Sequence, residues 1–175
     1  VYMAKLPVKV QKSKTFRDIL KQDSLLKQEQ KFIQRGEYEK QALKNISHVT
    51  GRTHWDYNSV AEAKEVTREK NSENKIRYHF MNETLRNNFY DGSWDSQKCI
   101  PYSIFISQGD YPIKGLHFML QAMPRILEKF PDTTVWVSGN NVTKISTLKE
   151  KIKISAYGKY LKKLLKENRL QDKVH

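Results

Sequence analysis

Cysteine is nearly absent from this 175-residue sequence, and long apolar runs are absent too. Cys99 is the only cysteine, which excludes an internal disulfide and a multi-cysteine metal site. No apolar run approaches the roughly 20 residues that a membrane-spanning helix needs. The first residues lack the apolar centre of a secretory signal, and position 1 is Val rather than Met. We therefore expect the chain to begin inside a longer, cytoplasmic protein.

Several motifs of known chemistry are also missing. The sequence contains no phosphate-binding loop of the Gly-x-x-x-x-Gly-Lys-Ser/Thr type, no Gly-x-Gly-x-x-Gly, no Gly-x-Ser-x-Gly and no His-Glu-x-x-His. The histidines lack the paired spacing of metal ligands; they are His48, His54, His79, His117 and His175. We therefore expect no metal site and no bound cofactor.

Basic residues, in contrast, are in clear excess. The formal net charge is +13, and residues 98–175 hold 14 Lys and Arg against 6 Asp and Glu, while residues 1–97 hold 18 against 13. Such a charge favours anionic partners, which include nucleotide phosphates, nucleic acid and acidic membrane surfaces. The sign of the charge does not decide among these three classes.

Residues 102–139 predict a strand, a loop, a helix and a second strand. The apolar run 104–106 leads into a loop that ends at Gly115. Apolar residues then recur at helical spacing as far as position 130, with Pro124 inside the predicted helix, where we expect a kink or an early restart of the helix. The second strand, 134–137, stops at a turn that contains Gly139 and Asn140. This order is that of a βαβ unit.

Lys114 lies where the loop of this unit meets the helix. Such junctions bind anions in α/β proteins, because backbone N–H groups and the positive helix end face the loop and a lysine adds a full charge. We therefore expect a phosphate-bearing ligand here. The alternative is a solvated lysine on a surface turn.

The rest of the chain predicts further helices. Two Thr-x-x-Asp sequences, beginning at Thr15 and Thr53, are typical of helix starts in which the aspartate caps back to the threonine. The first helix is predicted to extend to about Arg35, to break at Gly36 and to resume up to about Lys44. Arg52 lies in the turn before the second helix, where we expect it to meet either an anionic substrate group or a structural carbonyl or carboxylate.

Short strands and a linker complete the prediction. Alternation of apolar and polar residues predicts strands at 46–50 and 75–80. Turn-forming residues predict a linker between two domains at 91–98. A lysine-rich amphipathic helix is predicted at 157–168, and the start of another strand at 171–175. Strands that alternate with helices indicate the α/β class.

Three clusters of residues carry a family resemblance, and each contributes to a strand or to the turn that follows it. They are residues 49–56, residues 78–90 and residues 106–117, the last continued by 120–122, 130–132 and 137–140. Together, and in this order, they resemble the bacterial retaining glycosyltransferases of the GT-B fold, in the large family 4 (glycosyl transferases group 1). The resemblance covers most of the chain from about Thr15 onward.

The resemblance implies two Rossmann-like domains that face each other across a cleft. Residues 1–97 would be the C-terminal part of the acceptor domain and the linker, and residues 98–175 the first half of the domain that binds the nucleotide-sugar donor. The activity implied is that of a hexosyltransferase. It moves a sugar from a nucleotide-diphospho-sugar to an acceptor hydroxyl during glycan or polysaccharide synthesis. The chain looks incomplete, so we do not expect the fragment alone to be active.

The resemblance also implies roles for individual residues. Residues expected at the donor diphosphate are Lys114, Gly115, Gln108 and Gly109, and those at the turn beside the nucleotide are Gly139 and Asn140. Gln108 stands where relatives have an arginine. Residues expected at the acceptor or between the domains are Arg52 and Asn82. The catalytic acidic pair of the family is expected beyond His175.

The partners implied are a nucleotide-sugar and a glycan or lipid-linked acceptor, with no metal. The absence of Asp-x-Asp agrees with relatives that neutralise the diphosphate with protein cations and helix dipoles. The basic charge adds an anionic membrane surface as a candidate partner on the inner face of the membrane. A nucleic-acid-binding module is the alternative from the charge and the interleaved aromatic residues. It is disfavoured because the lysines follow the solvent faces of amphipathic helices.

Overall fold

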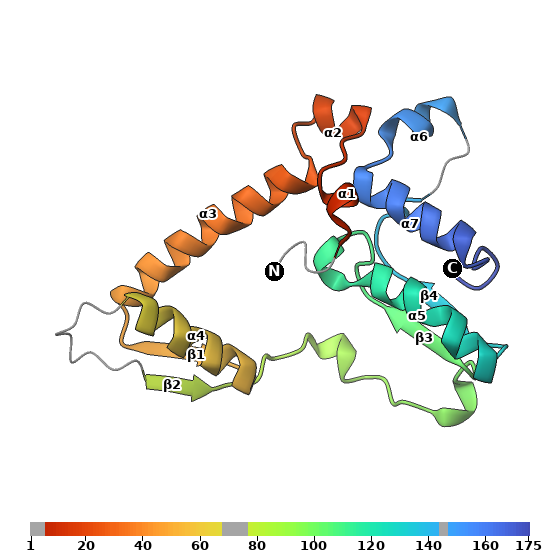
Figure 1. The fold of residues 1–175 in the computed structure, drawn as a ribbon. Coiled ribbons are helices and arrows are strands. Elements are labelled where there is room, and N and C mark those ends of the chain that lie inside the picture. The colour runs from red at the N-terminus through yellow and green to blue at the C-terminus, as the bar shows by residue number, and fades with distance from the viewer. Residues whose placement is uncertain (1–5, 68–76, 144–146) are drawn as a thin grey trace. The chain divides into compact units, whose positions relative to one another are not determined.

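Helices and short parallel strands alternate along the chain in the computed structural model (Figure 1), which describes residues 6–67, 77–143 and 147–175. The mixed α/β class predicted from the sequence is confirmed at this level. The elements in order are α1 (Val8–Gln11), α2 (Phe16–Leu20), α3 (Leu25–Lys44), β1 (His48–Gly51), α4 (His54–Thr67), β2 (Arg77–Phe80), η1 (Asn87–Phe89), η2 (Ser96–Lys98), β3 (Ser103–Ile106), η3 (Pro112–Lys114), α5 (Leu116–Lys129), β4 (Thr134–Val137), α6 (Leu148–Lys153) and α7 (Ala156–Glu167).

Contacts divide the chain into two compact units. Unit 1 consists of the N-terminal segment up to Lys31 together with Lys98–His175, and unit 2 is Phe32–Gln97. The second boundary falls where the sequence predicted the two domains to meet. The N-terminal segment differs from that prediction, because it belongs by contacts with the C-terminal part of the chain. The acceptor and donor roles assigned to the two parts remain predictions.

The sheet of unit 1 is parallel and follows the order of the chain. β3 pairs with β4 in a register that runs from Ser103 opposite Thr134 to Ile106 opposite Val137. On the other side of β4, the chain end adds a parallel bridge between Val135 and Val174, so the predicted strand start at 171–175 is present as a single bridge. β4 is therefore the central strand, and the side chain of Val135 is fully buried.

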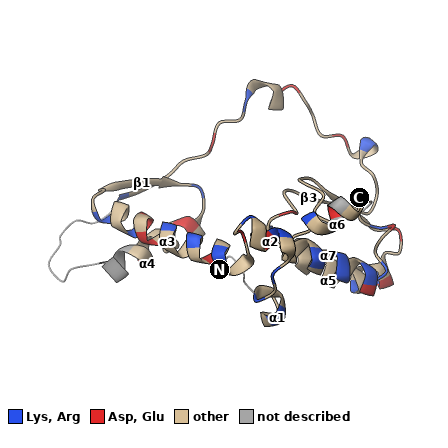
Figure 2. Ribbon diagram, turned by 90° about the horizontal axis from the view of Figure 1, so that it is seen from above, with Lys and Arg blue, Asp and Glu red and all other residues tan. Residues whose placement is uncertain are grey.

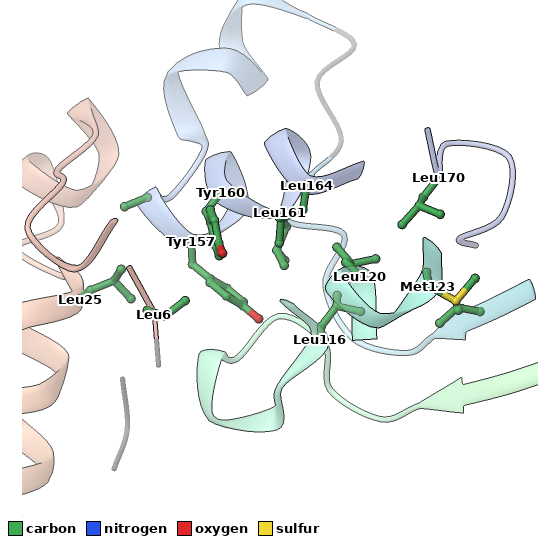
Figure 3. Packing of buried hydrophobic residues seen from close by; sticks show 12 residues of the cluster. Leu6, Leu25, Leu116, Leu120, Met123, Tyr157, Tyr160, Leu161, Leu164 and Leu170 are labelled. Atoms are coloured by element: carbon green, nitrogen blue, oxygen red, sulfur yellow. The ribbon is translucent and has the colours of Figure 1, made fainter. Parts of the chain in front are cut away.

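Two amphipathic helices, α5 and α7, form the core of unit 1 above this sheet (Figure 3). Their facing side chains interdigitate at helical spacing, as the sequence predicted for both segments. Leu25 and Leu6 extend the core towards the N-terminal segment. The buried apolar residues are Leu6, Leu25, Leu116, Leu120, Met123, Val135, Ala156, Tyr157, Tyr160, Leu161, Leu164 and Leu170.

Pro124 lies inside α5, yet the helix continues through it from Leu116 to Lys129. Proline has no N–H, so the carbonyl of Leu120, four residues earlier, loses its helical donor. The side chain of Asn168 supplies a replacement, because its Nδ2 donates to the Leu120 oxygen at 2.9 Å. Asn168 is also the residue that ends α7. The helix therefore tolerates the proline without the restart that the sequence predicted.

Asp18 fastens the N-terminal segment to the rest of unit 1. Its carboxylate closes the predicted capping box at Thr15, accepting from the Thr15 N–H at 3.0 Å while the Asp18 N–H donates to the Thr15 hydroxyl. The same oxygen accepts from the N–H of Ala156, the first residue of α7, at 2.9 Å. Arg17 Nη1 donates to the other oxygen at 3.1 Å. This carboxylate, only 3% exposed, thus caps two helices that are far apart in sequence.

The long helix α3 corrects two predictions. The helix expected from Thr15 to Arg35 is split after α2 by a turn in which Gln22 adopts a positive φ of 49°. The break expected at Gly36 is wrong, because α3 runs from Leu25 to Lys44 without interruption. A glycine costs a helix only about 1 kcal/mol relative to alanine. The surrounding Gln, Glu, Lys, Arg and Leu residues are good helix formers and offset that cost.

Unit 2 contains the parallel pair β1–β2, with α4 as the connection between them. Gly51 ends β1 beside Tyr78, and a Cβ at position 51 would collide with the Tyr78 hydroxyl and ring. The second predicted cap is confirmed, because the Thr53 N–H donates to Asp56 at 3.1 Å and the Asp56 N–H donates to Thr53. In the part of unit 2 whose side chains the structure describes, no residue is buried.

The double role of Asp18 predicts an uneven loss of stability in two variants. Asp18→Ala leaves two backbone N–H groups and a guanidinium without their acceptor and should lower the free energy of unfolding by about 3 kcal/mol. Thr15→Ala removes only the local cap and should cost about 1 kcal/mol. Urea unfolding followed by circular dichroism measures both. Equal losses in the two variants would show that the bond to Ala156 contributes nothing.

The pairing of Pro124 with Asn168 predicts a coupled response. Asn168→Ala leaves the Leu120 carbonyl unsatisfied and should cost about 1–2 kcal/mol. In a Pro124→Ala background, the N–H of residue 124 can bond this carbonyl, so the same change should cost less by about 1 kcal/mol. A double-mutant cycle on the free energy of unfolding gives the coupling directly, and strictly additive costs would contradict the exchange of donors.

Candidate functional site

The candidate site lies at the carboxyl ends of β3 and β4, where open parallel sheets bind their ligands. The segment that follows β3 and the turn that follows β4 are held together by backbone hydrogen bonds. Ser138 N donates to the oxygen of Ile106 at 2.9 Å, and Gly109 N donates to the oxygen of Ser138 at 3.0 Å. Gln108 N donates to the Ser138 hydroxyl at 3.3 Å. We call residues 107–115 the β3–α5 loop.

Close packing explains the glycines of this site. Gly109 is buried, and a Cβ there would run into the side chains of Val137 and Leu116. Gly139 has a φ of 116°, and a Cβ there would lie 2.6 Å from an oxygen of Asp110. Gly115 adopts a left-handed φ of 79° between η3 and α5, where a residue with a Cβ is strained. All three positions therefore require glycine for reasons of backbone geometry.

Asp110 is a site residue that the sequence analysis missed. Its Oδ2 accepts a hydrogen bond from Asn140 Nδ2 at 2.9 Å. Its Oδ1 is buried and has no hydrogen-bond partner among the described residues. Asn140 was predicted beside a nucleotide, and the structure shows that its amide orients a carboxylate of the loop. Gly and Asp are common in turns, so sequence alone gave no signal for this pairing.

The first N–H groups of α5 are less accessible than the sequence suggested. The N–H groups of Leu116 and His117 have no acceptor within the helix, as in any first turn. Both residues are buried, however, so these groups lie below the surface of the loop. An anion on this loop would be attracted by the positive end of the helix without touching those two N–H groups.

Lys114 and Gln108 lie on the exposed surface of the β3–α5 loop. Lys114 is the last residue of η3, and Gln108 adopts a positive φ of 57°. Tyr111 and Ile113 are exposed on the same loop. The loop thus presents one lysine and one amide to solvent.

The structure brings some of the predicted residues together in one small pocket. Gly109, Gly139 and Asn140 line a pocket of about 110 Å³ at the carboxyl end of the sheet, with Val137 and His175 beside them. Lys114, Gly115 and Gln108 do not line it. The predicted diphosphate residues are therefore divided between this pocket and the exposed loop surface.

A larger pocket, of about 340 Å³, opens on the other side of Asp110. It lies between the N-terminal segment, the β3–α5 loop and the start of α7. Its charged lining consists of Arg17 together with Asp18, Asp23 and Asp110. Arg17 already contacts Asp18 at 3.1 Å and Asp23 at 3.9 Å. Three carboxylates against one guanidinium disfavour an anion here, which leaves the exposed loop as the better place for a phosphate.

His117, the second residue of α5, is buried between the two core helices and is 1% exposed. Its Nδ1 lies 3.2 Å from the hydroxyl of Tyr157, and its Nε2 has no partner among the described residues. The ring also packs against Phe118 and Tyr160. Burial lowers the pKa of His117 below its ordinary value, because a charged imidazolium loses its hydration there.

The two remaining predicted residues, Arg52 and Asn82, belong to unit 2. Arg52 Nη1 lies 2.9 Å from the carboxylate of Glu83, and both side chains are largely exposed. Of the two roles considered for Arg52, the structure shows the pairing with a carboxylate. Such exposed pairs contribute about 0–1 kcal/mol. Asn82 is exposed shortly after β2.

Neither a cluster of metal ligands nor a membrane-spanning helix is found among the described residues. Over the described ranges, the structure contains no group of three or more His, Cys, Asp and Glu side chains placed to hold a metal ion. Within the same ranges, none of the helices combines the length and the apolar character needed to cross a bilayer. Comparisons with protein-family models, with curated proteins and with solved structures found no match.

The buried histidine predicts a pH-dependent stability. Because the pKa of His117 is lower in the folded chain, its contribution is fully present above the unfolded pKa of about 6.5 and is lost as the pH falls below it. The free energy of unfolding should therefore decrease between pH 7 and pH 5, and less steeply in His117→Phe. The exposed histidine of α4 offers the control, His54→Gln, which should keep the original slope. An unchanged slope in His117→Phe would contradict the assignment.

Proposed function

We propose that this chain carries part of the donor-binding half of a hexosyltransferase of the GT-B type. Such an enzyme moves a sugar from a nucleotide-diphospho-sugar to an acceptor hydroxyl in glycan or polysaccharide synthesis. Unit 1 would correspond to the start of the donor domain and unit 2 to a part of the acceptor domain. The three sequence clusters support this assignment, and the parallel α/β units agree with it at the level of fold class.

One observation carries the proposal. The β3–α5 loop and the Gly139–Asn140 turn lie together at the carboxyl edge of two parallel strands, and Lys114 is exposed at the start of the helix between them. A strand-end turn beside a loop with a positive charge is a combination that suits a nucleotide diphosphate. Gly109 and Gly139 allow the loop and the turn to pack closely against neighbouring side chains.

The exposed surface of the loop is the part that would meet the diphosphate. Lys114 would contribute a full positive charge and the start of α5 a partial one, which together offset the charge that develops as the nucleotide diphosphate departs. Gln108 would contribute hydrogen bonds without charge. The carboxylate of Asp110 faces Asn140 and Gly139, so a diphosphate placed on the side of Lys114 avoids direct contact with it.

The acceptor would approach from residues outside this loop. A glycan or a lipid-linked acceptor is proposed as the second substrate, with its hydroxyl attacking the anomeric carbon of the donor sugar. Arg52 and Asn82 of unit 2 are proposed to lie near the acceptor or between the domains. The protein is proposed to act in the cytoplasm and at the inner face of the membrane, without a metal ion. The acidic pair that completes the site is proposed to follow His175.

Binding of nucleotide diphosphates to the chain tests the role of Lys114. Titration calorimetry with uridine, guanosine and adenosine diphosphates should detect binding of at least one of them. Lys114→Ala should weaken that binding about tenfold, which corresponds to about 1.4 kcal/mol. The matched control is Lys129→Ala, an exposed lysine in the last turn of α5, and it should bind as the unmodified chain does.

Two outcomes would contradict the proposal. Undiminished binding by Lys114→Ala would remove the lysine from the donor site. Absence of binding for every nucleotide, combined with tight and salt-dependent binding of duplex DNA, would instead favour a nucleic-acid-binding module. The electrostatic part of that binding is largest at low salt, so a salt series decides the second case.

A further inference from the structure

Two short neighbouring helices of unit 1 expose apolar side chains to solvent. On α2, Phe16, Ile19 and Leu20 are 64%, 63% and 73% exposed. Their spacing of three and four residues places them on one face of the helix. The opposite face of α2 carries Asp18, which is buried in the contacts with Thr15 and Ala156. The helix therefore turns its polar side inward and its apolar side outward.

The helix α6 also exposes apolar side chains. Leu148 and Ile152, one helical turn apart, are 81% and 54% exposed. A capping box between Thr147 and Glu150 fixes the start of the helix. α2 and α6 contact each other and lie side by side (Figure 1). We refer to the five exposed apolar residues of these two contacting helices together as the α2–α6 surface.

The charges around the α2–α6 surface are mainly basic. Lys12 and Lys14 precede α2, Lys21 follows it, and Lys153 ends α6, all of them exposed. Asp18 and Asp23 both contact Arg17, so these three residues together leave one negative charge against the four lysines. In Figure 2, Lys and Arg recur beside α1 and α2 and along α7. An apolar centre with a basic margin is an unusual surface for a protein to expose to water.

We propose that the α2–α6 surface docks onto an anionic lipid bilayer. Apolar side chains of surface helices enter the boundary between headgroups and acyl chains, and lysines at the margin attract acidic lipids. Aliphatic residues such as Ile19, Leu20 and Leu148 favour a bilayer over nucleic acid, which is held by aromatic stacking and phosphate contacts. A second copy of the chain is disfavoured because two basic margins would face each other.

The α2–α6 surface extends the membrane partner included in the proposed function, but it uses no residue of the β3–α5 loop. Docking through it would hold unit 1 at the membrane surface, within reach of a lipid-linked acceptor. The bonds that fix both helices are made by Thr15, Asp18, Thr147 and Glu150. Exposed apolar residues can therefore be replaced without removing these bonds, and the test requires no sugar donor.

Co-sedimentation with vesicles tests this surface in the full chain. The chain should bind vesicles of phosphatidylcholine with 30% phosphatidylserine and bind pure phosphatidylcholine much less. Ile19→Ser with Leu20→Ser, or Leu148→Ser with Ile152→Ser, should weaken binding to the anionic vesicles by at least about tenfold, because each aliphatic side chain contributes insertion free energy. Ile100→Ser, an equally exposed apolar residue outside the surface, should bind as the unmodified chain does.

The contribution of charge is tested separately. Lys14→Glu with Lys21→Glu should weaken binding to the anionic vesicles about tenfold or more, since each lysine near the membrane adds attraction. Lys129→Glu, at the end of α5, is the matched control. Equal binding to both kinds of vesicle, or serine variants that bind normally, would overturn the proposal. A serine variant that alters the oligomeric state but not vesicle binding would also overturn it, because the surface would then be an interface between two copies of the chain. Circular dichroism confirms that each variant is folded.

Discussion

The carboxylate of Asp18 is the contact on which the arrangement of unit 1 depends. It accepts hydrogen bonds at the start of α2 and at the start of α7, across a separation of 138 residues. Without it, the N-terminal segment would keep the contacts of α1 with α7 and the places of Leu6 and Leu25 in the apolar core. The same contact determines which face of α2 is exposed and gives the larger pocket one of its walls. The pocket and the α2–α6 surface therefore both follow from a single buried charge with satisfied hydrogen bonds.

Local patterns in the sequence predicted the parts of the fold that depend on neighbouring residues. The helical periodicity of α5 and α7, the strand before the β3–α5 loop and both Thr-x-x-Asp caps are present in the structure. The bond from Ala156 to Asp18 has no such pattern, because its partners are far apart in sequence. Gly36 misled the prediction, since its helix propensity alone does not decide whether a helix continues.

In the candidate site, too, some features followed from local sequence and others depended on residues far apart in the chain. Gly109 and Gly139 could be recognised as turn residues, and the structure gives the reason in the contacts that a Cβ would make. The role of Asp110 could not be recognised from the sequence, because it depends on the orientation of the Asp110 side chain towards Asn140. The burial of Leu116 and His117 was also invisible in the sequence, although it changes how the end of α5 acts on the loop. Distances and accessibility, more than residue types, determine what this loop can bind.

The pairing of Pro124 with Asn168 has a consequence for how this sequence can change over time. A chain with an N–H donor at position 124 has no need of an amide at position 168, so an asparagine that is already present lowers the cost of introducing the proline. Once both are in place, Asn168 cannot be replaced first without leaving the carbonyl of Leu120 unsatisfied, whereas Pro124 can be, because another residue there brings its own N–H. Substitutions at the two positions are thus linked in order as well as in effect. Among descendants of this chain, Pro124 without a side-chain donor near position 168 should be rare.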